Sequence, residues 1–282
     1  MKYDKFYTKP QIVSQCYQML KNIYPDIEKE CFLEPSAGDG AFLSMLPNYI
    51  AYDILPEGDN IIQQDFLTLE PDKNNYVVIG NPPFGKRSKM AIDFFNHATL
   101  FGNIIAFIVP ASFMKWSVQK NLNRDFKLVF YNFLEPESFL VEGRPYSVRC
   151  VFQIWARESQ IDLRLKAAPP TKHPDFNLWQ YNATPQAFKY IDENWTYAVY
   201  RQGYKDYSVL FVKEDKEQIK KEMEQNIQFF FIEPLADDAE RFVKECDFNV
   251  LAEMNTSTPG FGKGDFISFY MEWKKLKYKK ED

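Results

Sequence analysis

Short runs of apolar residues, bounded by turn-forming residues, recur along the first half of the chain. They lie at residues 31–33, 49–52, 76–79 and 104–109. Such runs are typical of strands buried on both faces, so we expect an α/β fold with a mainly parallel sheet and helices on both sides. Two further β-rich runs, 128–133 and 148–155, predict the antiparallel edge of the same sheet.

A helical pattern precedes the first of these runs. Apolar residues recur at helical spacing at positions 12, 16, 19, 20 and 23, which predicts a helix with one face toward the core. Thr8 can cap this helix, and Pro10 is tolerated in its first turn.

The composition changes after about residue 157. Prolines, charges and many of the aromatic residues follow, and 213–225 is a candidate charged helix. Aromatic residues make up 17% of the chain, an excess that favours stacking surfaces. We predict two domains, residues 1–157 and 158–282.

Charge and cysteine content exclude several classes of protein. The 34 Lys and Arg against 39 Asp and Glu give a net charge of −5, which excludes a globally basic nucleic-acid binder but not a local basic patch. The four cysteines include no CxxC pair and the chain has two histidines, so we expect reduced, buried thiols and no metal site. Without an apolar signal core or a run long enough to span a bilayer, we expect a soluble, cytoplasmic protein with no membrane association.

A turn with two glycines follows the first predicted strand. Glu34 stands at the strand end and Gly38 lies where the chain turns toward a helix. Open α/β sheets bind ligands at this end, and glycine permits close backbone approach. Asp53 ends the next strand, where it can accept hydrogen bonds from ribose hydroxyls, and Asp65 with Phe66 could hold an adenine ring. An ordinary connection and exposed acids are the alternative interpretation.

The residues Asn81, Pro82, Pro83 and Phe84 follow the strand run that ends near residue 80. A planar exocyclic amine is a poor nucleophile because its lone pair is delocalised, and it improves when acceptors hold both amine hydrogens. The Asn81 side-chain carbonyl and the Pro82 backbone carbonyl are two such acceptors, the prolines stiffen the loop, and Phe84 offers a stacking face. A rigid surface turn is the alternative.

Three segments together resemble a known family. FYTKP at 6–10, EPSAGDG at 34–40 and NPPF at 81–84 occur in this order, and a separate carboxy-terminal region follows. The constellation resembles the adenine-N6 DNA methyltransferases of the gamma class, over residues 1 to about 157. The resemblance implies a class I, Rossmann-like methyltransferase sheet that binds S-adenosylmethionine, methylation of a flipped-out adenine in double-stranded DNA, and a smaller α+β target-recognition region at 158–282.

The resemblance also implies roles for individual residues. It places Tyr7, Thr8, Glu34 and Gly38 by the methionine moiety of the cofactor, Asp53 at the ribose, and Asp65 and Phe66 at the cofactor adenine. It assigns the target base to Asn81, Pro82 and Phe84. For the aromatic residue on the other face of the base we prefer Phe139 over Tyr146, and either could instead be a core aromatic.

Basic residues near these motifs are candidate phosphate contacts. Lys86, Arg87 and Lys89 follow Phe84 directly, and Lys263 lies in a glycine-rich stretch of the second region. Solvated charges and a plain surface loop are the alternatives.

Other functions remain open from the sequence. Methylation of adenine N6 in RNA would use the same pocket, and relatives that methylate glutamine or guanine N2 usually carry Tyr where this chain has Phe84. A catalytically inactive nucleic-acid binding module is an alternative of another class. We expect a monomer, and the sequence indicates neither the recognition sequence nor whether a restriction nuclease accompanies the enzyme.

Overall fold

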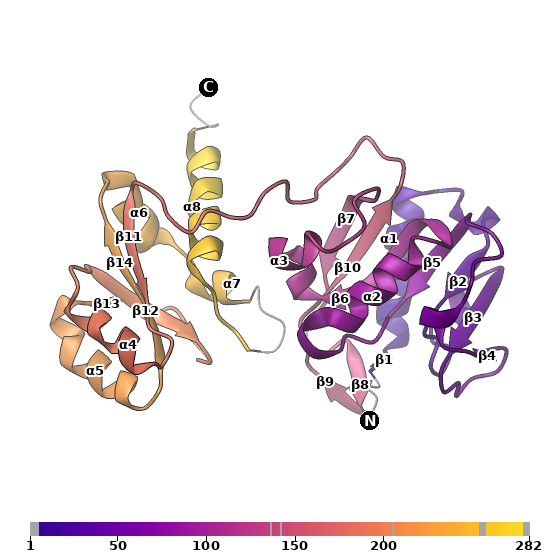
Figure 1. Cartoon of the computed structure of the whole chain (residues 1–282), viewed down its shortest axis with the longest axis horizontal. Coiled ribbons are helices and arrows are strands. Elements are labelled where there is room, and N and C mark those ends of the chain that lie inside the picture. The colour runs from indigo at the N-terminus through magenta and orange to yellow at the C-terminus, as the bar shows by residue number, and fades with distance from the viewer. Residues whose placement is uncertain (1–5, 136, 142, 205, 254–257, 279–282) are drawn as a thin grey trace. The chain divides into compact units, whose positions relative to one another are not determined.

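The chain divides into two compact units, Met1–Lys166 and Ala167–Asp282. The computed structural model describes residues 6–135, 137–141, 143–204, 206–253 and 258–278 (Figure 1). The predicted boundary after residue 157 falls just past the last strand of the first sheet. Residues up to Lys166 also belong to the first unit, where Leu163 N donates to Leu128 O at 2.8 Å and Arg164 donates to four backbone carbonyls.

A seven-stranded sheet forms the centre of the first unit, in the order β4-β3-β2-β5-β6-β10-β7. Its strands are β2 (Phe32–Glu34), β3 (Tyr49–Asp53), β4 (Ile62–Gln63), β5 (Tyr76–Gly80), β6 (Gly102–Pro110), β7 (Lys127–Phe133) and β10 (Cys150–Ala156). β10 pairs antiparallel with both β6 and β7, and the other pairs are parallel, so β10 alone runs opposite to the rest. The predicted, mainly parallel sheet is confirmed. Of the two runs expected at its antiparallel edge, only β7 lies at the edge.

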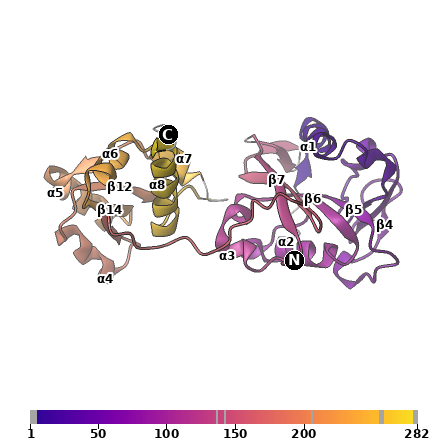
Figure 2. The same cartoon turned by 90° about the horizontal axis from the view of Figure 1, so that it is seen from above.

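Helices cover both faces of this sheet (Figure 2). On one side lies α1 (Pro10–Ile23), and on the other lie α2 (Lys89–Ala98) and the short α3 (Trp116–Gln119). Alternate residues of each strand serve the two cores: Val77 and Ile79 pack with α1, whereas Val78 packs with α2. Burial of both strand faces explains why these strands were visible as continuous apolar runs.

The amino terminus departs from the predicted helix start. Thr8 lies in β1 (Tyr7–Thr8), which pairs with β8 (Phe139–Val141), and β8 pairs with β9 (Arg144–Tyr146). Lys9 is the N-cap of α1, and no side chain caps the helix. The predicted cap at Thr8 is therefore wrong, because the Thr8 hydroxyl accepts a hydrogen bond from Asn81 instead.

The second unit is built on a four-stranded antiparallel sheet in the order β11-β14-β12-β13. Its strands are β11 (Phe176–Gln180), β12 (Tyr197–Gln202), β13 (Phe211–Val212) and β14 (Gln228–Pro234). Its helices are α4 (Pro185–Phe188), α5 (Lys216–Glu224), α6 (Asp237–Glu245), α7 (Phe248–Ala252) and α8 (Lys263–Tyr278). This mixture of strands and helices is the α+β arrangement that was expected, and α5 lies within the predicted charged helix.

Aromatic side chains fill the core of the second unit. Phe229 and Phe231 of β14 are both fully buried, and Phe266 and Tyr270 of α8 contact Phe176 edge-on. Much of the aromatic excess in the sequence is therefore packing material rather than exposed stacking surface.

Short 3₁₀ segments complete the described elements: Ile27–Lys29, Leu43–Met45, Phe66–Thr68, Lys86–Ser88, Ala111–Met114, Lys189–Asp192 and Lys213–Asp215. All four cysteines are free thiols; Cys16 and Cys150 are buried as expected, whereas Cys31 and Cys246 are partly exposed. Within the part of the chain that the structure describes, no helix is long and apolar enough to cross a membrane. In the same residues, no three His, Cys, Asp or Glu side chains are grouped to hold a metal ion.

Candidate active site

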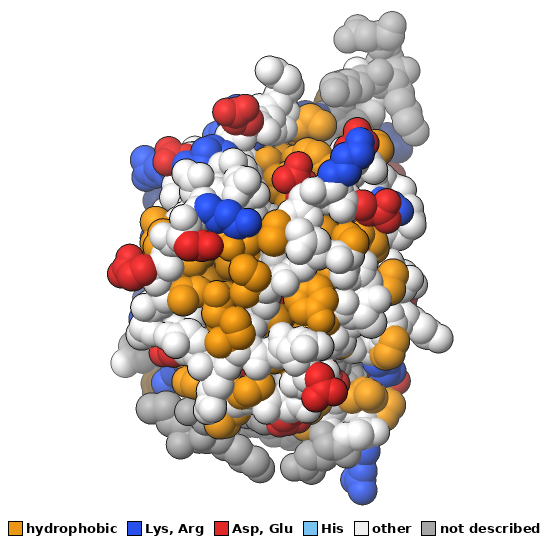
Figure 3. Space-filling model, turned by 90° about the vertical axis from the view of Figure 1, so that its right-hand side faces the viewer, with side chains coloured by type: hydrophobic (Ala, Val, Ile, Leu, Met, Phe, Trp, Pro, Cys, Tyr) orange, Lys and Arg blue, Asp and Glu red, His pale blue; other side chains and the backbone are white. Residues whose placement is uncertain are grey.

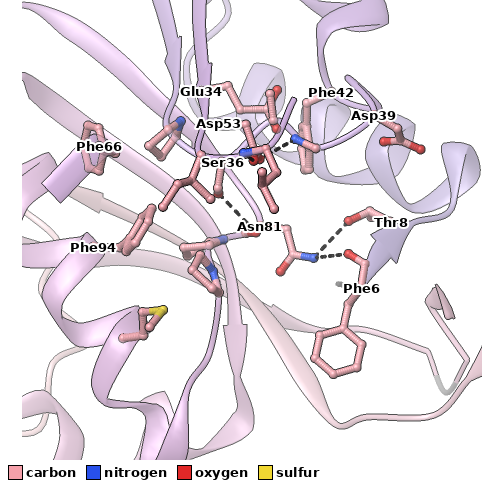
Figure 4. Close-up of a pocket in the computed structure, with 18 of the residues that line it drawn as sticks. Phe6, Thr8, Glu34, Ser36, Asp39, Phe42, Asp53, Phe66, Asn81 and Phe94 are labelled. Carbon is pink, nitrogen blue, oxygen red and sulfur yellow. Dashed lines mark hydrogen bonds between the residues drawn. The ribbon is translucent and has the colours of Figure 1, made fainter. Parts of the chain in front are cut away.

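A cavity of about 380 Å³ opens at the carboxyl ends of β2, β3 and β5 (Figure 4). The structure brings all seven residues predicted for the cofactor into its wall: Tyr7, Thr8, Glu34, Gly38, Asp53, Asp65 and Phe66. Asn81 and Pro82 line the same cavity, whereas Phe84 is not part of its wall. The sequence stretches that were singled out separately therefore form one concave site, at the position where open α/β sheets bind ligands.

The glycine turn fixes the carboxylate at the end of β3. Gly38 has a φ of 58°, a left-handed conformation that side chains disfavour. Its N–H donates to Asp53 Oδ2 at 2.8 Å, and the Leu55 N–H donates to Oδ1 at 2.7 Å. Each oxygen keeps a second acceptor site, so Asp53 is held in place and can still accept from a ligand hydroxyl.

Glu34 is a buried acid with an unpaired oxygen. It is 2% exposed, and its Oε2 has no hydrogen-bond partner among the described residues. Burial, followed by the nearby carboxylates of Asp39 and Asp53, holds the pKa of Glu34 well above its usual range. Gly80 makes room for this side chain, since a Cβ there would lie 3.3 Å from Glu34 Cγ. The arrangement suits a cationic hydrogen-bond donor, which would lower this pKa and satisfy Oε2.

The opposite part of the cavity is apolar with one acid. Phe66 is buried against Phe94, with ring centroids 5.4 Å apart, and both residues line the cavity. Asp65 Oδ1 accepts from Leu67 N at 3.0 Å, which orients the carboxylate at the start of the 3₁₀ segment. Phe42, just before the 3₁₀ segment Leu43–Met45, and Phe94, in α2, also line the site. Sequence reasoning gave neither a role, because core aromatics carry no distinguishing signal.

The cavity has an apolar outer rim. Figure 3 views the first unit from the side of β4, where hydrophobic side chains gather near the middle of the face and charged ones lie toward its margin. Ile54 and Leu55, at 44% and 42% exposure, line the cavity from the chain after β3. An apolar rim of this kind would cover the flat face of a bound ring.

The Asn81 amide has a defined orientation. Its Nδ2 donates to the Phe6 backbone carbonyl and to Thr8 Oγ1, both at 3.2 Å (Figure 4). A backbone carbonyl can only accept, so the NH₂ group faces the amino-terminal strand and Oδ1 faces away. Oδ1 is buried without a partner among the described residues. The site therefore presents one oriented, unused acceptor at the end of β5.

Four aromatic rings lie beyond Asn81. The Phe6 ring stacks near Phe84 and near Tyr146, with centroid distances of 5.8 and 5.3 Å and interplanar angles of 25° and 29°. Phe139 meets Phe6 edge-on at 6.3 Å and is fully buried, whereas Tyr146 is 44% exposed. Tyr146 is thus accessible from solvent, whereas Phe139 is not. Phe6 belongs to the FYTKP segment, but the sequence predicted no role for it. Its position follows only from the pairing of β1 with β8.

The predicted phosphate contacts lie outside the cavity wall. Lys86 and Arg87 are exposed, and Lys89 forms an ion pair with Asp93 at 2.6 Å. Lys263 begins α8 in the second unit, where burial and the neighbouring Lys172 lower its pKa.

Comparisons with solved structures find low-identity similarity over parts of the chain. A candidate RNA methyltransferase from Pyrococcus horikoshii is 14% identical, with 55% of this chain and 87% of that chain covered and a TM-score of 0.44. A candidate class I S-adenosylmethionine-dependent methyltransferase from Listeria monocytogenes is 14% identical, with 57% and 64% covered and a TM-score of 0.43.

A type I restriction-modification methyltransferase subunit from Streptococcus thermophilus is 13% identical, with 87% of this chain covered and a TM-score of 0.43; the match spans 58% of that longer chain. No protein-family model matches the sequence, and no match was found among curated proteins. The sheet has the class I methyltransferase fold. The strand order of the first unit and its single antiparallel strand β10 carry this assignment.

Proposed function

We propose that the chain is an S-adenosylmethionine-dependent DNA methyltransferase that modifies N6 of adenine. The observation that carries the proposal is the Asn81 amide, whose Oδ1 is a buried acceptor without a partner among the described residues. An exocyclic amine is a donor of the kind that this oxygen lacks.

The cavity suits the proposed cofactor, which is cationic at its sulfonium and ammonium groups. One part of the wall is acidic, since it contains Glu34, Asp39 and Asp53. Glu34 Oε2 has no hydrogen-bond donor among the described residues. Asp53 would accept from the ribose hydroxyls, and Asp65 with Phe66 would hold the adenine. Tyr7 and Gly38 would border the methionine moiety, and the Thr8 hydroxyl would contact its carboxylate. When bound, S-adenosylmethionine supplies a methyl group on a good leaving group.

The chain's own contribution to the reaction is positioning and polarisation. Asn81 Oδ1 and the Pro82 carbonyl accept the two amine hydrogens, which draws the nitrogen lone pair out of conjugation. The Asn81 amide is fixed beforehand by its bonds to Phe6 and Thr8, so little reorganisation accompanies the reaction. Once methylated, N6 carries a positive charge and is acidic, so it releases one proton to solvent without a strong base.

The target adenine has to leave the duplex, because its N6 is otherwise paired and stacked. The resemblance assigns Phe84 to one face of the extruded base, but Phe84 is 7% exposed and stacks near Phe6, so this contact requires a local movement. Tyr146, which has an exposed ring, is the better candidate for the other face than the fully buried Phe139. Lys86, Arg87 and Lys89 would contact flanking phosphates, and the second unit would recognise the target sequence, with Lys263 as one contact.

Methyl transfer by wild type and by Asn81→Ala tests the proposal. Labelled methyl from S-adenosylmethionine should appear in unmethylated duplex DNA with the wild type, and Asn81→Ala should reduce the rate by about 10²–10³-fold. Binding of cofactor and DNA should stay within a few fold, because Asn81 acts on the amine. Full activity in Asn81→Ala would refute the mechanism. No transfer by the wild type, with DNA binding retained, would favour the inactive binding module.

A further inference from the structure

The second unit carries a polar cluster at one end of its sheet that the proposed active site does not use. β14 runs antiparallel to both β11 and β12, so the carboxyl ends of those two strands meet the amino end of β14. Four side chains converge there, and we call them the amide–arginine cluster: Gln180, Arg201, Gln202 and Gln228. All four are partly exposed.

Three amides surround one guanidinium. Arg201 Nη1 donates to Gln202 Oε1 at 3.2 Å and also to Gln228 Oε1. With the Gln180 amide turned so that its oxygen faces the guanidinium, that oxygen accepts from Nε at 3.0 Å and from Nη2 at 3.2 Å. Three strands thus each supply a neutral acceptor to the same cation, and the guanidinium plane is fixed.

The positive charge of Arg201 is not neutralised by these partners. Among the residues that the structure describes, Arg201 makes no ion pair. Burial lowers its pKa and the more distant Asp265 raises it, and a guanidinium stays charged at neutral pH in either case. The chain that leads into α8 lies beside this strand, because the Phe261 N–H donates to Arg201 O at 3.1 Å.

We propose that the amide–arginine cluster is the surface by which the second unit reads duplex DNA, with Arg201 donating to the major-groove edge of a guanine. This inference rests on the proposed function. Guanine presents O6 and N7 as acceptors, which match two parallel donors of a guanidinium, and glutamine amides recognise adenine N6 and N7. Neutral amide oxygens can be exchanged for base acceptors, whereas a carboxylate partner would hold the cation more strongly.

Guanine edges and backbone phosphates both offer oxygen acceptors to Arg201. A contact to a base and a contact to a phosphate predict different experimental results. A base contact changes which sequences are methylated. A phosphate contact weakens binding to all sequences alike and lowers the salt dependence of binding.

The experiment uses full-length Arg201→Ala and Arg201→Lys, with Arg241→Ala as matched control. Arg241 is exposed in the same unit and pairs with Glu245 on its own helix. Unmethylated genomic DNA is treated with each protein and S-adenosylmethionine, and methylated adenines are mapped by sequencing. DNA binding at several salt concentrations and thermal unfolding are measured on the same samples.

We expect both Arg201 variants to lose about 5- to 150-fold in kcat/KM on the wild-type sites and to tolerate other bases at one G·C position. Arg241→Ala should keep the wild-type sites. Unchanged sites with uniformly weaker binding and a lower salt slope would assign a phosphate contact and overturn base reading. Unchanged sites and binding in a folded Arg201→Lys would overturn the contact altogether. A wild type that does not methylate DNA would instead refute the proposed function.

Discussion

Polar side chains at strand ends form the candidate sites of both units, but their hydrogen bonding differs. Buried acceptors are left unpaired in the first site, whereas the polar groups of the second are paired with one another. At the ends of β2 and β5, Glu34 Oε2 and Asn81 Oδ1 are buried without partners in the described structure. In the amide–arginine cluster of the second unit, Arg201 already donates hydrogen bonds to neutral amides. An unpaired buried acceptor costs stability until a ligand donates to it, whereas a satisfied cluster must exchange bonds. The first site should therefore respond more strongly to single substitutions.

Glu34→Gln should give the largest of the effects below. We expect the affinity for S-adenosylmethionine to fall about 10- to 150-fold, because a charge-assisted hydrogen bond to the cation is lost. Titration calorimetry measures this affinity. Asp59→Asn, at an exposed acid that does not line the cavity, is a control for general loss of negative charge in this unit. Equal losses in both variants would contradict a specific role for the buried carboxyl.

The pH dependence of stability should follow from the same residue. Because the pKa of Glu34 is raised in the folded chain, the folded state keeps a proton that the unfolded state releases. The contribution to the free energy of unfolding is therefore complete below the ordinary glutamate pKa of about 4.3 and is lost as pH rises through the raised value. Thermal unfolding across this range should show the decline in wild type and not in Glu34→Gln, and cofactor affinity of the wild type should rise with pH. Parallel pH curves for the two proteins would refute this assignment.

Tyr146 and Phe139 should separate activity from stability. Tyr146→Ala removes an exposed ring, so we expect a loss of about 5- to 150-fold in kcat/KM from lost base stacking, with little change in Tm. Phe139→Ala removes a fully buried ring and should cost about 3–5 kcal/mol of unfolding free energy. Steady-state kinetics and thermal unfolding of both variants test this pair. A stable Phe139→Ala protein with greatly reduced activity would restore Phe139 as the stacking residue.

Removal of the exposed cations should have the smallest effects. Lys86→Ala should weaken DNA binding a few fold and lower the salt slope by about 1, if Lys86 contacts one phosphate. Lys89→Ala should change binding less, since its ammonium already pairs with Asp93. Binding at several salt concentrations distinguishes the two. Identical salt slopes for wild type and Lys86→Ala would exclude this phosphate contact.

The sequence predicted the first unit better than the second, for physical reasons. Strands buried on both faces are continuous apolar runs, and the motifs at their ends stand at recognisable spacing, so 34–40 and 81–84 could be placed at one edge. The short strand β4 is exposed and left no such run. Thr8 was wrongly predicted as a helix cap because a threonine before a helix favours that role. Its hydroxyl instead accepts a hydrogen bond from Asn81, which is far away in the sequence.

The amide–arginine cluster could not be predicted from the sequence. Its members are single polar residues at the ends of three strands, and only the antiparallel register of β11, β12 and β14 brings them together. The stacking of Phe6 near Phe84 likewise depends on the pairing of two short strands far apart in the chain. Long-range register of this kind is set by tertiary packing rather than by local pattern.

Identification of the methylated nucleoside shows whether the enzyme acts on adenine N6 in DNA. Wild-type protein and labelled S-adenosylmethionine are incubated in parallel with unmethylated duplex DNA and with total RNA, and both are digested to nucleosides for mass analysis. We expect N6-methyldeoxyadenosine in the DNA digest. N6-methyladenosine in the RNA digest alone would keep the role of Asn81 but contradict the DNA substrate, and label in neither nucleic acid would contradict the proposed activity.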